Sequence, residues 1–322
     1  MIDRYLDYLR DIRGLSPRTV RSYANDLGRF ETFARDRGSD PAGADRTLVR
    51  AYISDLSRHR LAATSVNRMI SSLRGYFRFL IRIGSRTTDP LSGTRGLREH
   101  QHLPGYLSEG EINRFFDLPG DDFLGTRDRL VFELLYSTGC RVAELVGMNL
   151  TDVSIAERTA KVRGKGNKER IVFLVDRAVE AVKTWIPIRE NHVDRDDDDA
   201  GRALVLNNHG RRITVRGVFY LIRTYSDRLV PGKAVGPHTF RHSFATHLLN
   251  RGANIRMVQE MLGHSNLSTT QVYTHTGIER LASVYRKAHP HATLEHRVGN
   301  CSRPTDPDRG RGPTKGEQCD NV

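Results

Sequence analysis

Apolar side chains in residues 1–92 recur at the three- and four-residue spacing of amphipathic helices, and this pattern starts afresh four times. The first stretch covers residues 2–12. Ser16, followed by a proline, has the form of an N-cap that opens the second. Two more stretches run over 48–56 and 66–80. The pattern therefore predicts an N-terminal domain built only of helices.

The pattern is interrupted over residues 93–106, which are rich in Gly, Arg and His and have little apolar periodicity. Such a composition is typical of an interdomain linker. Beyond it, Ser108 and Glu111 have the spacing of a capping box, and a strongly apolar helix should end at Gly139. These signals place the start of a second domain at residue 107.

The second domain, residues 107–292, adds one β-pattern to its helical ones. Residues 160–163 and 169–174 flank a turn rich in Gly and Asn, which predicts a β-hairpin. The acidic residues 194–199 predict a solvated loop rather than a metal site, because no spaced partner ligands accompany them. Residues 293–322 are rich in Pro, Gly and charge and are predicted to be disordered. The expected fold class is mostly α with a small β-hairpin or sheet, an α+β fold.

The balance of charges points to a polyanionic partner. The 322 residues include 51 basic and 38 acidic side chains, a net charge of +13, and only seven of the basic residues are lysines. A GC-rich genome explains the preference for arginine but not the excess of positive charge. Residues 1–92 hold 17 arginines, no lysine and 10 acidic residues, which suggests a DNA clamp, with ordinary solvated helix faces as the alternative. Nucleic acid is therefore the expected partner.

The chain carries no sign of a membrane or secretory destination. Its three cysteines, Cys140, Cys301 and Cys319, form no paired framework, which favours a reducing compartment. A run of about 18 apolar residues is absent, and the N-terminus lacks the apolar core of a signal peptide. We therefore expect a cytoplasmic protein with no membrane partner.

The stretch from His238 to Tyr273 and two residues upstream of it carry the groups needed to cleave a phosphodiester without a metal. Arginine forks bind phosphate oxygens, imidazoles move or stabilise protons, and a tyrosine phenolate can carry the phosphoryl group. Six residues supply these groups: Arg141, Lys165, His238, Arg241, His264 and Tyr273. The alternative, a zinc site at His238 and His242, lacks the expected Glu after His238 and a nearby cysteine. Neither a metal nor a cofactor is expected.

Three blocks of the chain resemble, in order, the tyrosine recombinases of the phage integrase family, and specifically its Xer-type members. The blocks are STGCRVAEL at 137–145, GKGNKER at 164–170, and the segment 238–275. The resemblance covers nearly the whole chain and implies a SAM-like core-binding domain followed by a tyrosine-recombinase catalytic domain. Cys140 departs from the pattern, because a larger apolar residue is usual there; the change should affect packing rather than chemistry.

The resemblance assigns Arg141 and Arg241 as the two arginines that clamp the scissile phosphate. Their planar forks suit this role, because attack on a phosphodiester concentrates charge on its non-bridging oxygens. Glu144, three residues after Arg141 on the same helix face, is expected to support the site rather than react.

The remaining roles concern nucleophilic attack and proton transfer. Tyr273 is the expected nucleophile, with His238 as a base and with His264 at a position that family members fill with His or Trp. The 5′ oxygen is a poor leaving group unless it is protonated, which suits Lys165 as general acid in the hairpin turn. Lys168 is a nearby competitor for that role.

Partners and reaction also follow from the resemblance. It implies double-stranded DNA with a short inverted-repeat site, and a homo- or hetero-tetramer with a second recombinase. A septal DNA translocase is a further partner of such systems. The segment 278–288 is expected to dock on a neighbouring protomer, with its own domain as the alternative.

The expected reaction is site-specific recombination through a 3′-phosphotyrosyl intermediate, in Xer-type resolution of chromosome or plasmid multimers. Alternatives are an integrase of a mobile element, a type IB topoisomerase-like enzyme and a non-catalytic DNA-binding regulator.

Overall fold

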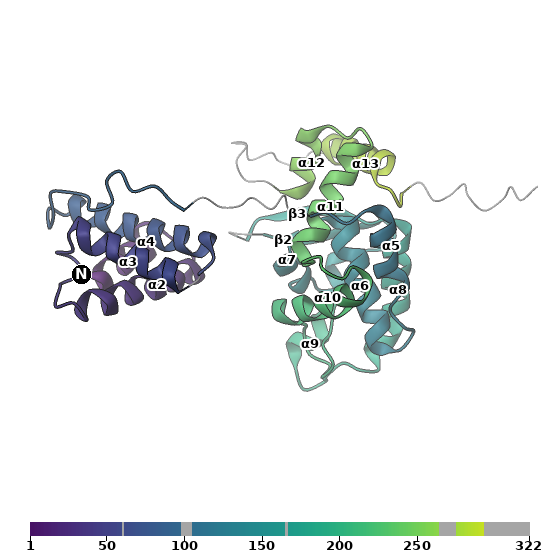
Figure 1. Ribbon diagram of the computed structural model, residues 1–322. Coiled ribbons are helices and arrows are strands. Elements are labelled where there is room, and N and C mark those ends of the chain that lie inside the picture. The colour runs from purple at the N-terminus through teal and green to yellow at the C-terminus, as the bar shows by residue number, and fades with distance from the viewer. Residues whose placement is uncertain (60, 98–104, 165–166, 264–274, 293–322) are drawn as a thin grey trace, which may run out of the picture. The chain divides into compact units, whose positions relative to one another are not determined.

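The computed structural model in Figure 1 divides into two compact units, Met1–His102 and Leu103–Val322. It describes residues 1–59, 61–97, 105–164, 167–263 and 275–292. The described residues form helices and one three-stranded sheet, which lies in the second unit. The predicted fold class, mostly α with a small sheet, is therefore confirmed. No helix in these ranges combines the length and apolar character needed to cross a bilayer.

The N-terminal unit contains the four predicted helical stretches. These are α1 (Ile2–Asp7) continued by a π-helical turn (Tyr8–Ile12), α2 (Pro17–Arg35), α3 (Arg46–Arg58) and α4 (Ala63–Arg82). Ser16 caps α2 as expected, since its Oγ accepts a hydrogen bond of 3.2 Å from the Thr19 amide. Phe30, Tyr52 and Phe77 are buried where α2, α3 and α4 meet, with their rings in edge-to-face contact. The π-helical turn departs from the plain α-helix that the apolar spacing predicts.

Part of the segment that the sequence assigns to a linker packs on this unit. The Leu97 amide donates to Asn67 Oδ1 at 2.7 Å, and Asn67 Nδ2 donates to the Leu97 carbonyl at 3.0 Å. Arg74 Nη2 also donates to the Thr94 carbonyl at 3.0 Å. These hydrogen bonds attach residues up to Leu97 to the N-terminal unit, so the segment 93–97 is part of that unit in the structure.

The second unit is built around α6. Its elements are α5 (Glu109–Asp117), α6 (Phe123–Thr138), α7 (Val142–Val146), a 3-10 turn (Leu150–Asp152), β1 (Val153–Ser154), β2 (Thr159–Arg163), β3 (Glu169–Phe173), α8 (Asp176–Glu190), α9 (Asp198–Arg202), α10 (Val215–Leu229), α11 (Pro237–Asn250), α12 (Ile255–Leu262) and α13 (His275–Ala288). Helix α6 packs against α5, α8 and α11, and most of its residues are buried. The predicted capping box opens α5: Ser108 Oγ accepts from the Glu111 amide, and Glu111 accepts from the Ser108 amide. Both sequence signals, the cap and the apolar helix, therefore work as predicted.

The predicted hairpin is present as β2 and β3, and the short β1 adds a third antiparallel strand. Ala160, Val162 and Val172 point into the core, as the alternation of strand residues requires. Arg170 pairs with Val162 across the ladder and lies on the same buried face. A charged residue therefore occupies an otherwise apolar face of the sheet.

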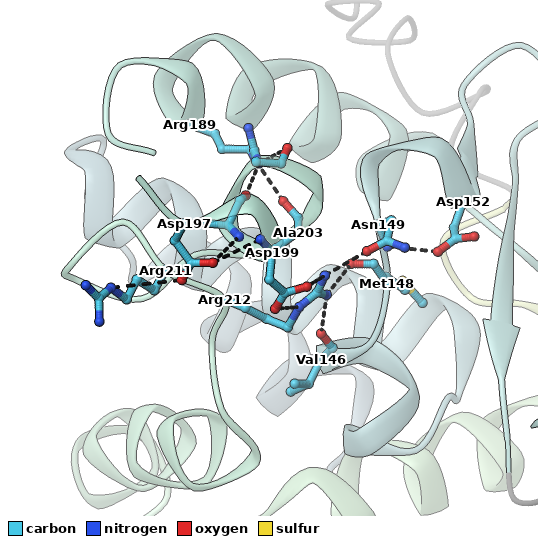
Figure 2. Close-up of polar contacts among 12 residues, drawn as sticks. Val146, Met148, Asn149, Asp152, Arg189, Asp197, Asp199, Ala203, Arg211 and Arg212 are labelled. Atoms are coloured by element: carbon cyan, nitrogen blue, oxygen red, sulfur yellow. Dashed lines mark hydrogen bonds and ion pairs between the residues drawn. The ribbon is translucent and has the colours of Figure 1, made fainter. Parts of the chain in front are cut away.

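The acidic segment 194–199 differs from the predicted solvated loop, because its last residues start helix α9 (Figure 2). Asp197 is the N-cap of α9 and accepts hydrogen bonds from the Asp199 and Ala200 amides. Asp194 pairs with Arg211 at 2.9 Å, and Asp199 pairs with Arg212 at 2.8 Å. These contacts make the segment a helix cap and a set of ion pairs.

Helix α13 packs on its own domain. Leu281, Tyr285 and Ala288 are buried among the core residues of the second unit. The Tyr285 hydroxyl donates to the Ser137 carbonyl at 2.9 Å, at the end of α6. Of the two docking alternatives, the structure therefore shows the intramolecular one, because the apolar stripe finds a complementary surface between α11 and α12.

Candidate active site

Three of the six predicted site residues, Arg141, His238 and Arg241, belong to the described part of the chain. Lys165, the predicted general acid, and the segment that holds His264 and Tyr273 lie outside it. The geometry of the site is therefore built from the arginines, the start of α11 and the residues that hold them.

Arg141 is placed by a sharp turn between α6 and α7. Gly139 ends α6 in the left-handed conformation with φ of 57°, and a Cβ there would lie 2.4 Å from the Phe244 ring. Arg141 is then the N-cap residue of α7. Glu144 accepts from the Arg141 amide at 2.8 Å and from its Nη1 at 2.9 Å. The carboxylate thus fixes one edge of a guanidinium whose side chain stays 42% exposed.

Arg241 is held by the carboxyl ends of two helices. Its Nη1 donates to the Gly139 carbonyl at the end of α6 (2.7 Å), and its Nη2 donates to the Leu262 carbonyl at the end of α12 (2.8 Å). Helix C-termini carry partial negative charge and favour a cation there. Burial, followed by the nearby charges of Arg141 and Arg170, lowers the pKa of Arg241 to about 10. The group therefore stays protonated at neutral pH in strongly positive surroundings.

His238 lies one helical turn before Arg241 at the start of α11, so the two residues share a helix. Its side chain is exposed, whereas that of Arg241 is partly buried. Pro237 at the first helical position suits this helix start. The pair therefore places a solvent-exposed imidazole one helical turn from a partly buried guanidinium.

The described edges of the hairpin turn show how tightly it is closed. The Gly164 amide donates to the Lys168 carbonyl at 2.8 Å, and Asn167 has a positive φ of 58°. Lys168 is exposed. The choice between Lys165 and Lys168 as general acid stays a prediction, because Lys165 is outside the described residues.

Arg170 is the site residue that the sequence analysis missed. Its Nη1 and Nη2 donate to the two carboxylate oxygens of Glu144, each at 2.8 Å, and the Arg170 side chain is only 7% exposed. Burial alone would raise the pKa of Glu144, but hydrogen bonds from Arg170 and Arg141 outweigh it and lower that pKa. An arginine on the apolar face of the predicted hairpin is the signal that could have revealed it.

The far end of α7 is anchored as well (Figure 2). Arg212 Nη1 donates to the Val146 and Met148 carbonyls, at 2.9 Å and 3.0 Å, and its Nη2 donates to Asn149 Oδ1 at 2.7 Å. The short helix that begins at Arg141 is thus fixed at both ends, which limits the movement of the Arg141 backbone.

Cys140, directly before Arg141, is a packing residue. It is fully buried, and burial raises the pKa of its thiol to about 11. A thiol in that state is a poor nucleophile at neutral pH. The expectation that this position affects packing rather than chemistry agrees with its burial.

No group of three or more His, Cys, Asp or Glu side chains within the described ranges is arranged to hold a metal ion. What the described residues of the site offer instead is three guanidiniums, from Arg141, Arg170 and Arg241, and the Glu144 carboxylate that pairs with two of them. Two positive charges remain in excess. Such a cluster suits an anionic ligand.

Comparison with known proteins identifies the class to which this fold and site belong. Residues 105–280 match the phage integrase family, and residues 2–84 match the phage integrase N-terminal SAM-like domain. The chain therefore belongs to the phage integrase family, the tyrosine recombinases, which are DNA strand-exchange enzymes with a tyrosine nucleophile.

Similar proteins within the family are Xer recombinases. The chain is 36% identical to tyrosine recombinase XerC of Treponema denticola over 302 residues, which are 91% of this chain and 99% of that protein. It is 38% identical to tyrosine recombinase XerD of Lacticaseibacillus casei over 291 residues, 90% of this chain and 98% of that protein. The similarity thus extends over both units.

Solved structures with the same fold include recombinases in complex with DNA. The XerH site-specific recombinase bound to palindromic difH substrate has a TM-score of 0.66 and 21% identity, covering 89% of this chain and 84% of that one. The Tn1549 transposon integrase with transposon right end DNA has a TM-score of 0.66 and 20% identity, covering 88% and 94%. At these identities the comparison establishes the shared fold.

Proposed function

We propose that this protein is a site-specific Xer-type tyrosine recombinase that resolves chromosome or plasmid multimers. It cuts and rejoins duplex DNA through a 3′-phosphotyrosyl intermediate. The observation that carries the proposal is the cluster of Arg141, Arg170 and Arg241, in which one carboxylate leaves two positive charges in excess. The XerC and XerD names of relatives at 36% and 38% identity support the Xer-type role.

The arginine pair stabilises the charge that develops when the phosphodiester is attacked. The transition state carries more negative charge on its non-bridging oxygens than the ground state, so cations fixed beside it lower the barrier. Arg241 uses two of its five N–H groups on helix-end carbonyls, and Arg141 uses one on Glu144. Among the described residues, the remaining N–H groups of both side chains have no hydrogen-bond partner and are available to the phosphate.

The other four residues supply the nucleophile and assist proton transfer. The Tyr273 hydroxyl attacks phosphorus, and its proton passes to His238, whose exposed side chain stands one turn from Arg241. Lys165 gives a proton to the departing 5′ oxygen, and His264 assists at the phosphate. The new phosphotyrosyl bond conserves the energy of the broken one, so a 5′ hydroxyl of another strand can reverse the step. The reaction therefore needs neither ATP nor a metal.

The partners follow from this reaction. The substrate is double-stranded DNA with a short inverted-repeat site, and exchange between two duplexes requires four protomers, either identical or paired with a second recombinase. A septal DNA translocase fits the chromosomal role. We expect the protein in the cytoplasm, where this DNA is found.

Helix α10 presents a surface suited to DNA. Phe219 and Tyr220 are 44% and 75% exposed, and Arg216 and Arg223 extend the same helix face by one turn in each direction. Phe219 lies beside Gly236, the residue that precedes α11 and its His238. Exposed aromatic and basic side chains on one helix face are typical of nucleic-acid contacts. We propose that this face binds the duplex next to the scissile phosphate.

The Arg223→Glu substitution should weaken DNA binding several-fold and reduce the slope of log affinity against log salt concentration by about one, because one phosphate contact is lost. Lys183→Glu on α8 is the matched control: Lys183 is also exposed, its ion-pair partner among the described residues is Glu180, and the charge change is the same. Fluorescence anisotropy over a salt series measures both. Equal losses in the two variants would mean that only the overall charge matters and would contradict the α10 assignment.

The function itself can be tested with an assay in which the protein selects its own target sequence from the genome. Fragmented, nicked genomic DNA from the host is incubated with the protein, and covalent complexes are collected in denaturant and sequenced. We expect adducts at a discrete inverted-repeat site. Two copies of that site placed in direct repeat on a plasmid should then be resolved into two circles.

Each alternative function predicts another result in the same two assays. Adducts without sequence preference, with relaxation of any plasmid, would identify a topoisomerase-like enzyme. Adducts confined to the ends of a mobile element would identify its integrase. Specific binding without any covalent adduct would identify a DNA-binding regulator and overturn the proposal.

A further inference from the structure

Arg170 connects three parts of the site that are far apart in the sequence. It lies on β3, five residues after Lys165, and its guanidinium donates hydrogen bonds of 2.8 Å to both carboxylate oxygens of Glu144. Its Nε donates to the Met261 carbonyl near the end of α12, at 3.3 Å, and its side chain packs against Gly263. The same residue thus contacts the strand of the hairpin, the carboxylate beside Arg141 and the helix end that holds Arg241.

The charge balance explains what this contact does. Glu144 is almost fully buried and accepts from two guanidiniums, those of Arg141 and Arg170. A buried carboxylate requires a cationic partner. Without Arg170, Arg141 would be the one remaining guanidinium hydrogen-bonded to Glu144 among the described residues. The guanidinium of Arg141 would then pair fully with the carboxylate. It would then be unavailable to a phosphate.

We propose that Arg170 is a positioning residue for strand cleavage: it neutralises Glu144, so that Glu144 orients Arg141 without sequestering its guanidinium. The inference rests on the proposed function, since it gives Arg141 the task of binding the scissile phosphate. Arg170 itself is directed away from the ligand, because its Nε, Nη1 and Nη2 all donate to protein groups. It acts through Arg141 rather than on the DNA.

A purely structural role would resemble that of Arg189, which offers a matched control in the same domain (Figure 2). Arg189 is 1% exposed, and it donates to the carbonyls of Ala200, Gly201 and Ala203 at the end of α9. It also pairs with Glu190. Removing either arginine should destabilise the domain, but only removal of Arg170 should change the chemistry.

The experiment compares Arg170→Met, Arg189→Met and the double variant Arg170→Met/Glu144→Gln in the full chain. Single-turnover formation of the covalent adduct is measured on a nicked suicide duplex, together with DNA affinity and the melting temperature. Arg170→Met should lower the cleavage rate on the order of 10²-fold, the scale for losing one preorganised phosphate donor. DNA affinity should change by less than about threefold, since phosphate contacts outside the site dominate binding.

The double variant tests the mechanism directly. Replacing the Glu144 carboxylate with a neutral amide removes the charge that would sequester Arg141. The double variant should therefore cleave at least about tenfold faster than Arg170→Met. It also removes the buried unpaired charge, which guards against failure of the single variant to fold. A double variant that cleaves no faster than Arg170→Met would overturn the inference.

A substrate with a different leaving group distinguishes the role of Arg170 from that of Lys165. A substrate with sulfur in place of the bridging 5′ oxygen releases a thiolate, which needs no proton. Lys165→Met should regain cleavage on this substrate, whereas Arg170→Met should remain impaired, as Arg141→Lys would. Recovery of Arg170→Met would show that it acts on the hairpin instead, and the inference would fail.

The controls also distinguish the role of Arg170 from the function of the whole protein. If the wild type forms no adduct on its own site, the proposed function fails, and the inference fails with it. If the wild type cleaves and Arg170→Met cleaves at the same rate, only the role of Arg170 is wrong. If Arg189→Met loses as much cleavage as Arg170→Met at an equal melting temperature, the loss reflects stability alone, which also overturns the inference.

Discussion

Replacement of Tyr273 by Phe is expected to abolish strand cleavage while DNA binding stays nearly unchanged. In the proposed reaction the phenolic oxygen forms the bond to phosphorus, so its removal should eliminate the reaction rather than slow it. The hydroxyl contributes little to affinity, which comes mainly from contacts between basic side chains and the DNA backbone. A nicked suicide duplex should therefore trap a covalent complex with the wild type and none with the variant.

Tyr225→Phe provides the matched control in the same domain. Tyr225→Phe likewise removes one phenolic oxygen, and with it the hydrogen bond that the Tyr225 hydroxyl donates to Asp128 at 3.0 Å. We expect it to be somewhat less stable and to cleave at nearly the wild-type rate. A covalent adduct formed by Tyr273→Phe would show that another residue is the nucleophile.

Arg141→Lys and Arg241→Lys should each reduce the cleavage rate on the order of 10²–10³-fold, although both keep the positive charge. An ammonium cannot donate two parallel hydrogen bonds to a phosphate. At Arg241 it also cannot reach the Gly139 and Leu262 carbonyls at the same time as the phosphate, because those carbonyls bind two different nitrogens of the guanidinium. Single-turnover cleavage on the suicide duplex measures the loss.

Arg177→Lys is the corresponding control. Arg177 pairs with Glu133 at 2.9 Å and stacks on Phe116, and it contacts none of the candidate site residues in the described ranges. The same substitution there should leave the rate within about threefold of the wild type, as is usual for changes away from a site. Near-normal cleavage by both site variants would mean that these arginines bind the DNA backbone without stabilising the transition state.

The sequence predicted individual elements of both units well because their signals are local. The Ser16 and Ser108 caps, the Gly139 helix stop and the hairpin each depend on residues within a few positions of one another. The family blocks are also continuous in sequence, so the candidate site residues could be assigned by position. The role of Glu144 beside Arg141 was accessible for the same reason, since one helical turn separates the two residues.

The partners of the site arginines could not be predicted, because they are far away in the sequence. Arg241 bonds to a carbonyl 102 positions earlier, and Arg170 bonds to a carboxylate 26 positions earlier. The spacing of apolar residues does not specify which helix ends converge, because that depends on how whole elements pack. The sequence likewise favoured docking of α13 on a neighbouring protomer, whereas the structure packs it on its own domain, and it assigned residues 93–97 to a linker although they bond to α4.

The amino-acid sequence by itself thus determined the helical and hairpin elements, the basic character of the chain, its family and the identity of the candidate nucleophile and arginines. Local hydrogen bonds, spacing and residue chemistry are sufficient for these. Only the tertiary structure decided how the positive charges of the arginine cluster are partnered. Two helix ends converge on Arg241, and Arg170 crosses from the sheet to neutralise Glu144. These contacts exist because buried charges and helix-end carbonyls must find partners, and packing alone determines which partners lie within reach.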